Sequence, residues 1–211
     1  MNRQDKLLQS IAGQLAEQGY AIINNALPDE LTQQLYQRVT TLAPEAFKPA
    51  GIGRSQAHRL DESYRRDQIH WLDSGDPAQS HYLVWMEALR QGINQQLFMG
   101  LFDYESHFAH YAPGTFYKRH LDAFKGETNR VVTTVFYLNP EWYKADGGEI
   151  ALYADEQQDQ PFTTLYPHAG TLLLFLSDQF PHEVRCAQRD RYSIAGWFRV
   201  KSLGTRVDPP H

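Results

Sequence analysis

The second half of the chain is a succession of short segments with strand periodicity, and this feature limits the fold more than any other. Turn-forming pairs such as Pro113-Gly114, Asn139-Pro140 and Gly147-Gly148 interrupt these segments at short intervals. Many short strands separated in this way predict an all-β sandwich or barrel, because each strand has to pair along its edges and bury a face. We place the strands at residues 104–112, 116–121, 131–138, 148–154, 162–166, 171–176, 181–186 and 191–199.

The first 100 residues instead show the period of amphipathic helices. Apolar residues recur at helical spacing over residues 4–18, 28–42 and 76–97, and short strands are expected at 20–23 and 69–71. The apolar stripe of the third helix is expected to pack on a sheet rather than to form a binding groove. The sequence therefore predicts a mainly β protein with N-terminal α-helices that buttress one sheet.

A chain of 211 residues, 42% hydrophobic and 13% aromatic, is expected to form a single domain. We expect this domain to cover residues 1–200, with a helical scaffold at 1–100 and the β core at 104–199. Residues 201–211 include two prolines and few apolar side chains, so this segment is expected to be a flexible tail.

The charge distribution argues against two classes of partner. The formal net charge is −5 and no run of Lys or Arg exceeds two residues, so neither nucleic acid nor an anionic membrane is an expected partner. Cys186 is the single cysteine, which excludes an intramolecular disulfide and fits a reducing compartment. The N-terminal residues lack the continuous apolar segment of a signal peptide, and no stretch approaches the roughly 18 apolar residues of a membrane span. We therefore expect a cytoplasmic protein.

Two histidines and one aspartate in the strand block have the spacing of a metal site. His120 and Asp122 are two residues apart, so on an extended strand both side chains point to the same face. His182 lies near the end of the block, where a second strand can bring it beside the pair. Two imidazoles and one carboxylate are the ligands of a facial-triad iron(II) site, which leaves positions open for substrate and oxygen. We therefore predict that His120, Asp122 and His182 bind the metal.

The other histidines are weaker candidates. His107 and His110 are three residues apart on a predicted strand, so they face opposite sides and do not readily bind one metal. The histidines expected to be solvated or hydrogen-bonded locally are His58, His70, His81, His168 and His211.

Arg191 follows His182 by nine residues and begins the last predicted strand. Its guanidinium can form a bidentate pair with the far carboxylate of a bound keto acid. Tyr137 lies in an apolar strand, where a buried phenol needs a polar partner that the same carboxylate would supply. The arginines better suited to surface ion pairs are Arg185, Arg189 and Arg199. Together these residues favour an iron(II)- and 2-oxoglutarate-dependent hydroxylase.

Several segments match, as a set, the motifs of one enzyme family. They are Tyr111-Ala-Pro-Gly114, Tyr117-Lys-Arg-His-Leu-Asp122, the strand from Arg130 to Asn139, Gly147-Gly148, Pro181-His-Glu-Val184 and Arg191-Tyr-Ser-Ile-Ala-Gly-Trp197. With these segments, residues 104–199 resemble the catalytic domain of the prolyl-4-hydroxylase superfamily of 2-oxoglutarate oxygenases. More narrowly, they resemble the oxygen-sensing prolyl hydroxylase domain enzymes of animals and their bacterial relatives. Residues 66–71 resemble the strand ahead of the substrate loop in that subfamily.

This resemblance implies a double-stranded β-helix (jelly-roll) with the triad at its open end. It also implies Fe(II) and 2-oxoglutarate as cofactors, with ascorbate as an optional addition, and the release of succinate and CO2. Arg191, with help from Tyr137, would bind the 5-carboxylate of 2-oxoglutarate. The residues that would surround the cofactor are Tyr111 and Trp197, and those that would lie at the substrate entrance are Arg130 and Tyr117.

The implied substrate is a protein with a target proline: elongation factor Tu for the bacterial relatives and the hypoxia-inducible factor for the animal enzymes. Because this chain is compact, we expect elongation factor Tu. The loop between Tyr111 and His120 is one residue shorter than in the animal enzymes, and Ala-Phe follows Asp122 where those have Asn-Pro. Both departures lie at the substrate mouth, so they bear on the substrate rather than on the chemistry.

Three alternatives stay open. The same chemistry could act on another side chain or on a small molecule such as free proline, or the chain could be a non-catalytic β-barrel binding module. A nucleic-acid demethylase is disfavoured, because that branch carries a second arginine six residues after the cofactor arginine, where this chain has Trp197.

Overall fold

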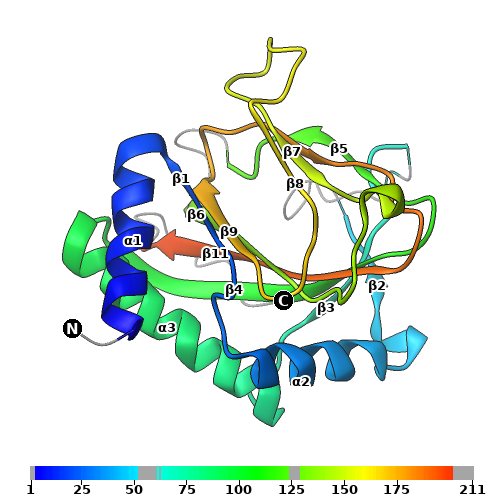
Figure 1. The fold of residues 1–211 in the computed structure, drawn as a ribbon, viewed down its shortest axis with the longest axis horizontal. Coiled ribbons are helices and arrows are strands. Elements are labelled where there is room, and N and C mark those ends of the chain that lie inside the picture. The colour runs from blue at the N-terminus through cyan, green and yellow to red at the C-terminus, as the bar shows by residue number, and fades with distance from the viewer. Residues whose placement is uncertain (1–2, 52–60, 62, 124–128, 202–211) are drawn as a thin grey trace.

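The computed structural model describes residues 3–51, 61, 63–123 and 129–201, which form two antiparallel sheets with α-helices against the larger one (Figure 1). The larger sheet contains, in spatial order, β1 (Tyr20–Ile23), β9 (Leu172–Leu176), β6 (Arg130–Tyr137), β11 (Arg191–Val200), β4 (Leu101–Tyr111), β3 (Gln68–Trp71) and β2 (Lys48–Pro49). The smaller sheet contains β5 (Tyr117–His120), β10 (His182–Val184), β7 (Ile150–Leu152) and β8 (Thr163–Leu165). The helices are α1 (Arg3–Gln18), α2 (Asp29–Thr40) and α3 (Pro77–Leu97), with single 3-10 turns at Pro44–Ala46 and Lys144–Asp146.

Helix α3 runs along the larger sheet and begins where the sequence predicts. The side chain of Asp76 accepts a hydrogen bond from the backbone N–H of Gln79, and Pro77 occupies the first turn, where its missing N–H costs nothing. Its apolar side chains join those of α1 and α2 in one core against the sheet, on the side away from β7 and β8 (Figure 1). The predicted packing of this stripe on a sheet is confirmed.

Alternate residues of the larger sheet enter two different environments. Phe108, Phe136 and Phe198 face the helices and form the main core with them. Their neighbours in sequence face the smaller sheet, where apolar residues such as Tyr137 and Ala109 pack against β7 and β10. This inner face also buries polar side chains, so the space between the two sheets is where chemistry can be placed.

The predicted mainly β architecture is confirmed, and the predicted helices and strands are present within a few residues of their expected ends. The first 100 residues are more than a helical scaffold, because β1, β2 and β3 extend the larger sheet at both edges. Strand β1 pairs with β9 and thereby covers backbone groups that an edge strand would expose. The extent of a single domain over 1–200 stays a prediction, and residues 202–211 of the predicted tail lie outside the described residues. Of the helices that the structure describes, none combines the length and the apolar character needed to cross a bilayer.

Gly196 lies where β11, β4 and α3 meet, and it has no room for a side chain. A Cβ atom here would lie 2.8 Å from the carbonyl oxygen of Glu105 and would also meet the Tyr104 hydroxyl. That hydroxyl lies 2.8 Å from Thr134 Oγ1 and 3.1 Å from Tyr82 Oη, and so links two strands to α3 through hydrogen bonds. A methyl group at position 196 would displace this buried network.

We therefore predict that Gly196→Ala lowers the free energy of unfolding by about 1–3 kcal/mol, the usual cost of overpacking a core. Urea denaturation measures the change. The control is Gly13→Ala on the exposed side of α1, where nothing lies within 4 Å of the added atom, and there we expect equal or greater stability. Equal stability of Gly196→Ala and the parent protein would contradict the prediction.

Candidate active site

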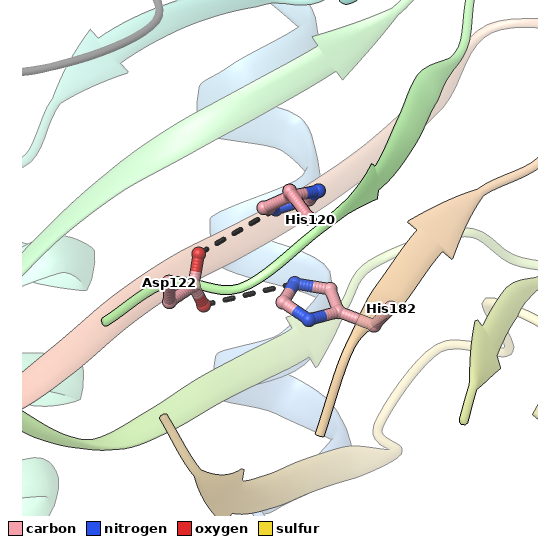
Figure 2. A group of neighbouring side chains, drawn as sticks. All are labelled: His120, Asp122 and His182. Carbon is pink, nitrogen blue, oxygen red and sulfur yellow. Dashed lines mark ion pairs between the residues drawn. The ribbon is translucent and has the colours of Figure 1, made fainter. Parts of the chain in front are cut away.

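Figure 2 shows the three predicted metal ligands side by side. His120 ends β5 and His182 begins β10, and the two residues are directly opposite one another in this antiparallel pair. Asp122 lies in the bend just beyond β5, so it is not on the strand itself. One ligand atom from each residue lies within 4.8 Å of the others. Among the described residues, no second group of three such side chains comes this close.

The backbone fixes the orientation of both imidazoles. Nδ1 of His120 lies 2.8 Å from the carbonyl oxygen of Lys118, and Nδ1 of His182 lies 3.1 Å from that of Phe180. Because a carbonyl oxygen only accepts hydrogen bonds, each Nδ1 carries a proton, so a neutral imidazole at either position has its lone pair on Nε2. The two Nε2 atoms face Asp122, at 3.5 Å from Oδ1 for His120 and 3.7 Å from Oδ2 for His182 (Figure 2).

The environment gives His182 and Asp122 the protonation states that a divalent cation requires. Burial lowers the pKa of His182 to about 4, and the neighbouring His120 acts in the same direction. Burial alone would raise the pKa of Asp122, but His182, His120 and Arg130 hold it well below its ordinary value. At neutral pH the site therefore presents a neutral imidazole at His182 and an ionised carboxylate at Asp122, which are the forms that bind metal.

Arg191 is among the most deeply buried side chains, with 1% of its surface exposed. Its Nε donates to the carbonyl oxygen of Gly148 at 2.8 Å and its Nη1 donates to Ser193 Oγ at 3.3 Å. Neither acceptor is charged, and no ion pair neutralises the guanidinium within the part of the chain that the structure describes. A buried cation is costly unless an anion completes its environment, so this position is suited to an anionic ligand.

Two tyrosine rings enclose the Arg191 guanidinium, with its Cζ 4.8 Å from the ring centroid of Tyr111 and 5.2 Å from that of Tyr137. Burial raises the pKa of Tyr137 to about 12, although Arg191 acts in the opposite direction. The Tyr137 hydroxyl lies near the Arg191 guanidinium but forms no hydrogen bond of normal geometry among the described residues, so its O–H is a buried donor that a ligand can use. Gly148 has a φ of 67°, and a Cβ atom there would lie 3.0 Å from Arg191 Cδ, which explains the glycine at this position.

Trp197 and Arg130 stack on one another farther along the inner face. Trp197 lies opposite Thr133 in the β11–β6 pair, and the Arg130 guanidinium lies 3.5 Å from the Trp197 ring centroid. Arg130 donates to Glu105 at 2.9 Å, and Arg199 donates to the other oxygen of the same carboxylate at 2.8 Å. Arg199 forms the expected ion pair, with Asp103 at 2.7 Å and also with Glu105, but its own side chain is buried and not at the surface as predicted, because these two carboxylates compensate its charge.

Tyr117 contacts a triad residue directly. Its ring stacks on His120 with centroids 3.5 Å apart and an interplanar angle of 16°. The Arg65 guanidinium covers the other face of Tyr117 at 4.1 Å and forms a bidentate pair with the buried Asp67. The predicted contact of Tyr117 with substrate stays a prediction, and the structure adds a role in holding the His120 ring.

The remaining predicted residues divide between the two faces and the surface. His107 and His110 face opposite sides of β4, as predicted, since His107 packs against Trp197 and His110 stacks on Tyr192. The arginines that form surface ion pairs, as predicted, are Arg185 and Arg189. The histidines that lie outside the described residues are His58 and His211.

Comparison with known proteins identifies the family that has this geometry. The profile of the 2OG-Fe(II) oxygenase superfamily matches residues 106–199. The crystal structure of a Pseudomonas putida prolyl-4-hydroxylase superimposes with a TM-score of 0.83 and 39% sequence identity, covering 92% of this chain and 100% of that one. The chain belongs to the prolyl-4-hydroxylase type of 2-oxoglutarate/iron(II) oxygenases.

One animal protein shares the fold of this chain, and another is similar in sequence. A Trichoplax adhaerens prolyl hydroxylase, solved in complex with a hypoxia-inducible factor oxygen degradation domain peptide, matches with a TM-score of 0.82 and 29% identity over 93% of this chain and 90% of that one. Egl nine homolog 1 of Mus musculus is 28% identical over 200 residues, covering 90% of this chain and 49% of that protein. The oxygenase thus spans about half the length of this curated relative. The structural likenesses confirm the predicted double-stranded β-helix.

One residue of the oxygenase site was not predicted from the sequence. Thr133 Oγ1 donates to Asp122 Oδ2 at 2.8 Å and lies 2.9 Å from Ser177 Oγ, so it holds the carboxylate oxygen that faces His182. The available signal was the pair Thr133-Thr134 inside an otherwise apolar strand, where a buried hydroxyl needs a partner. The sequence does not show which residue that partner is.

We predict that Thr133→Val weakens Mn(II) binding by about 10–100-fold, the usual effect of removing a group that orients a metal ligand. The two side chains have nearly the same shape, so the fold is expected to persist. Electron paramagnetic resonance of free Mn(II) measures the affinity. Thr134→Val is the matched control, because Thr134 bonds to Tyr104 on the opposite face and is expected to keep the affinity within twofold. Unchanged affinity in Thr133→Val would show that this hydroxyl is not needed.

The buried His107 makes the stability of this oxygenase depend on pH. Burial lowers the pKa of His107 to about 3, and Arg65 acts in the same direction. A histidine in the unfolded chain titrates near 6.5. Between about pH 3 and 6.5 the unfolded state therefore binds more protons, and lowering the pH through this range favours unfolding.

In the metal-free protein, the unfolding free energy is expected to fall between pH 7 and pH 5, and protonation of His107 in the unfolded chain accounts for about 2 kcal/mol of this fall. We predict that His107→Phe lacks this contribution. Guanidinium denaturation at the two pH values, for the parent and the variant, measures the difference. The same pH dependence in both proteins would contradict a neutral, buried imidazole at position 107.

Proposed function

We propose that this chain is an iron(II)- and 2-oxoglutarate-dependent dioxygenase that hydroxylates a prolyl residue in a protein substrate and releases succinate and CO2. The observation that carries the proposal is that one interior holds both a His-Asp-His triad and a buried arginine without an ion-pair partner among the described residues. Membership of the prolyl-4-hydroxylase type supports it.

The residues present fit both cofactors. Two imidazole nitrogens and one carboxylate are the ligands of a facial-triad iron(II), so His120, Asp122 and His182 would hold the metal. The remaining donors of Arg191 and the unpartnered hydroxyl of Tyr137 would bind the 5-carboxylate of 2-oxoglutarate. The aromatic residues that would wall this pocket are Tyr111 and Trp197.

When bound, iron(II) and 2-oxoglutarate supply the oxidising chemistry, in which O2 is consumed and the keto acid is converted to succinate and CO2. The side chains of the protein contribute binding and orientation. Arg191 fixes the far end of the keto acid, and the backbone bonds of His120 and His182 keep both Nε2 atoms directed at one point. The burial of Tyr111 and Tyr137 excludes water from the same space.

Elongation factor Tu is the protein substrate that we propose, on the strength of the sequence resemblance to bacterial relatives. A protein substrate as a class is supported by the Trichoplax relative, which was solved with a peptide fragment bound. Arg130 and Tyr117 are proposed to contact the substrate at the entrance. The same chemistry on another side chain or on free proline is the second candidate.

Incubating elongation factor Tu with the protein, Fe(II) and 2-oxoglutarate tests the proposal. We expect a mass increase of one oxygen atom, about 16 Da, on a proline-containing peptide, with succinate formed in step. Both signals should vanish when iron or 2-oxoglutarate is omitted and in Asp122→Ala, and should persist in His110→Ala. Parallel reactions with and without ascorbate test whether that reductant belongs to the cofactor set.

The other outcomes of this experiment are equally informative. If succinate forms only when free proline or another small molecule is added, the proposed protein substrate is wrong and the second candidate is supported. Binding of iron and 2-oxoglutarate without turnover on any substrate would indicate a binding module.

A further inference from the structure

Two buried polar atoms on the inner face have no hydrogen-bond partner among the described residues: His107 Nδ1 and Trp197 Nε1. The two residues are 5% and 8% exposed, and their ring centroids are 5.4 Å apart. A buried polar atom without a partner costs about 1–3 kcal/mol. Two such atoms on neighbouring rings therefore indicate a place where a polar atom of a ligand binds.

The strand register places this pair beside the triad. Trp197 lies opposite Thr133, whose hydroxyl donates to Asp122. His107 lies opposite Ala195, which is two residues before Trp197 and on the same face of β11. His107 and Trp197 therefore project into the interior that holds the triad, on the side of Arg130 rather than of Arg191.

Neighbouring side chains hold both rings in place. Trp71 meets His107 edge to face, with centroids 5.1 Å apart and an interplanar angle of 77°. Arg130 covers Trp197 and is itself held by the carboxylate of Glu105. A ligand atom that binds here meets donors whose orientation is already fixed, which lowers the entropic cost of binding.

The chemistry of the pair selects an oxygen atom. The indole N–H of Trp197 can only donate a hydrogen bond. His107 is neutral at working pH, because burial lowers its pKa to about 3, and its Nδ1 donates in the tautomer that places the proton there. Two donors on neighbouring rings match a peptide carbonyl oxygen, which can accept two hydrogen bonds, whereas a peptide N–H would meet the donor of Trp197.

We propose that His107 and Trp197 together bind a backbone carbonyl oxygen of the substrate peptide and so determine which carbon atom of the target residue faces the metal. This inference rests on the proposed function, since it requires a peptide substrate at the triad. His107 would then be a positioning residue for the substrate. Trp197 would have this role in addition to its proposed place in the lining of the cofactor pocket.

Three substitutions of His107 distinguish the contributions of Nδ1, of Nε2 and of the aromatic ring to substrate binding. His107→Asn places an amide where Nδ1 lies, His107→Gln places one where Nε2 lies, and His107→Phe keeps the ring without a polar atom. The binding probe is elongation factor Tu, titrated into protein loaded with Mn(II) and 2-oxoglutarate, so that no turnover is needed. Intrinsic tryptophan fluorescence reports binding, because Trp71 and Trp197 both contact His107.

We expect His107→Phe and His107→Gln to bind the probe about tenfold more weakly, the usual effect of one lost hydrogen bond, and His107→Asn to stay within about threefold. The affinity for 2-oxoglutarate should stay within twofold in all three variants. With iron in place of manganese, His107→Phe should form more succinate per hydroxylated product. The matched control is His110→Phe on the opposite face of β4, which should bind the probe like the parent protein.

If the parent protein binds the probe and His107→Phe binds it equally well, His107 is only a packed core residue and the inference is overturned, while the proposed function stands. The melting temperature is a second readout: a residue kept for binding leaves it unchanged or raised in His107→Phe, because an unpaired polar atom has been removed, whereas a packed core residue lowers it. If the parent protein itself does not bind the probe, the proposed substrate fails and the inference fails with it.

Discussion

Replacing Arg191 with methionine is expected to weaken 2-oxoglutarate binding by about 100-fold or more. The guanidinium is buried, donates to two neutral oxygens and has no ion pair among the described residues, so the incoming carboxylate is the anion that completes its environment. Removing it takes away two charge-assisted hydrogen bonds, each contributing about 1.5–3 kcal/mol. Methionine fills a similar volume, so the pocket is expected to keep its shape.

Calorimetric titration of 2-oxoglutarate into the Mn(II)-loaded protein measures this loss. The same titration on Arg189→Met is the control, because Arg189 forms its ion pair at the surface and is expected to change the affinity by less than twofold. We also expect Arg191→Met to be no less stable than the parent protein without 2-oxoglutarate, since a buried unpaired charge has been removed. Undiminished affinity in Arg191→Met would remove Arg191 from the cofactor site.

Replacing Asp122 with asparagine is expected to weaken iron binding by more than about 100-fold and to abolish succinate formation. Asparagine keeps the size of the side chain and the hydrogen bond from Thr133 but removes the negative charge of the triad. The two imidazoles are neutral ligands, so the carboxylate provides the only ligand charge that offsets the divalent cation. The loss of metal affinity in Asp122→Asn should exceed the loss in Thr133→Val, because Thr133→Val disturbs the orientation of the carboxylate without removing it.

Metal content after dialysis and the Mn(II) affinity by electron paramagnetic resonance check this prediction. His110→Asn is the control, since His110 pairs with Asp190 on the opposite face of β4 and takes no part in the triad. If Asp122→Asn retained the metal with parent affinity, the triad would not be the metal centre, whatever its effect on activity.

Much of the fold could be predicted from local patterns. Asp76 and Pro77 specify the start of α3 through capping and a fixed φ, and the run of β-branched and aromatic residues in Arg130–Tyr137 specifies a buried strand. The triad was also accessible, because His120 and Asp122 are two residues apart and the third ligand type is limited by iron chemistry. These features depend on residues close in sequence, which is why a single sequence carries them.

The rest of the site depends on contacts between distant strands. Thr133 of β6 contacts Asp122 in the bend after β5, and Arg199 is buried because Asp103 and Glu105 of β4 lie beside it. Neither contact leaves a pattern in the sequence, since any threonine or arginine on a strand has the same local signature. His107 was for the same reason expected only to be a poor metal ligand, and its place between Trp71 and Trp197 comes from the pairing of three strands.

The sequence by itself determined which elements form, and it singled out three side chains as candidate metal ligands and one arginine as the candidate partner of a carboxylate. Spacing, turn chemistry and ligand type are local properties, and they hold whatever the rest of the chain does. Only the tertiary structure decided which polar atoms are satisfied and which are left without a partner. Burial and hydrogen bonding depend on the register between strands far apart in the chain, and that register places Arg191, Tyr137 and His107 in one interior with unused donors.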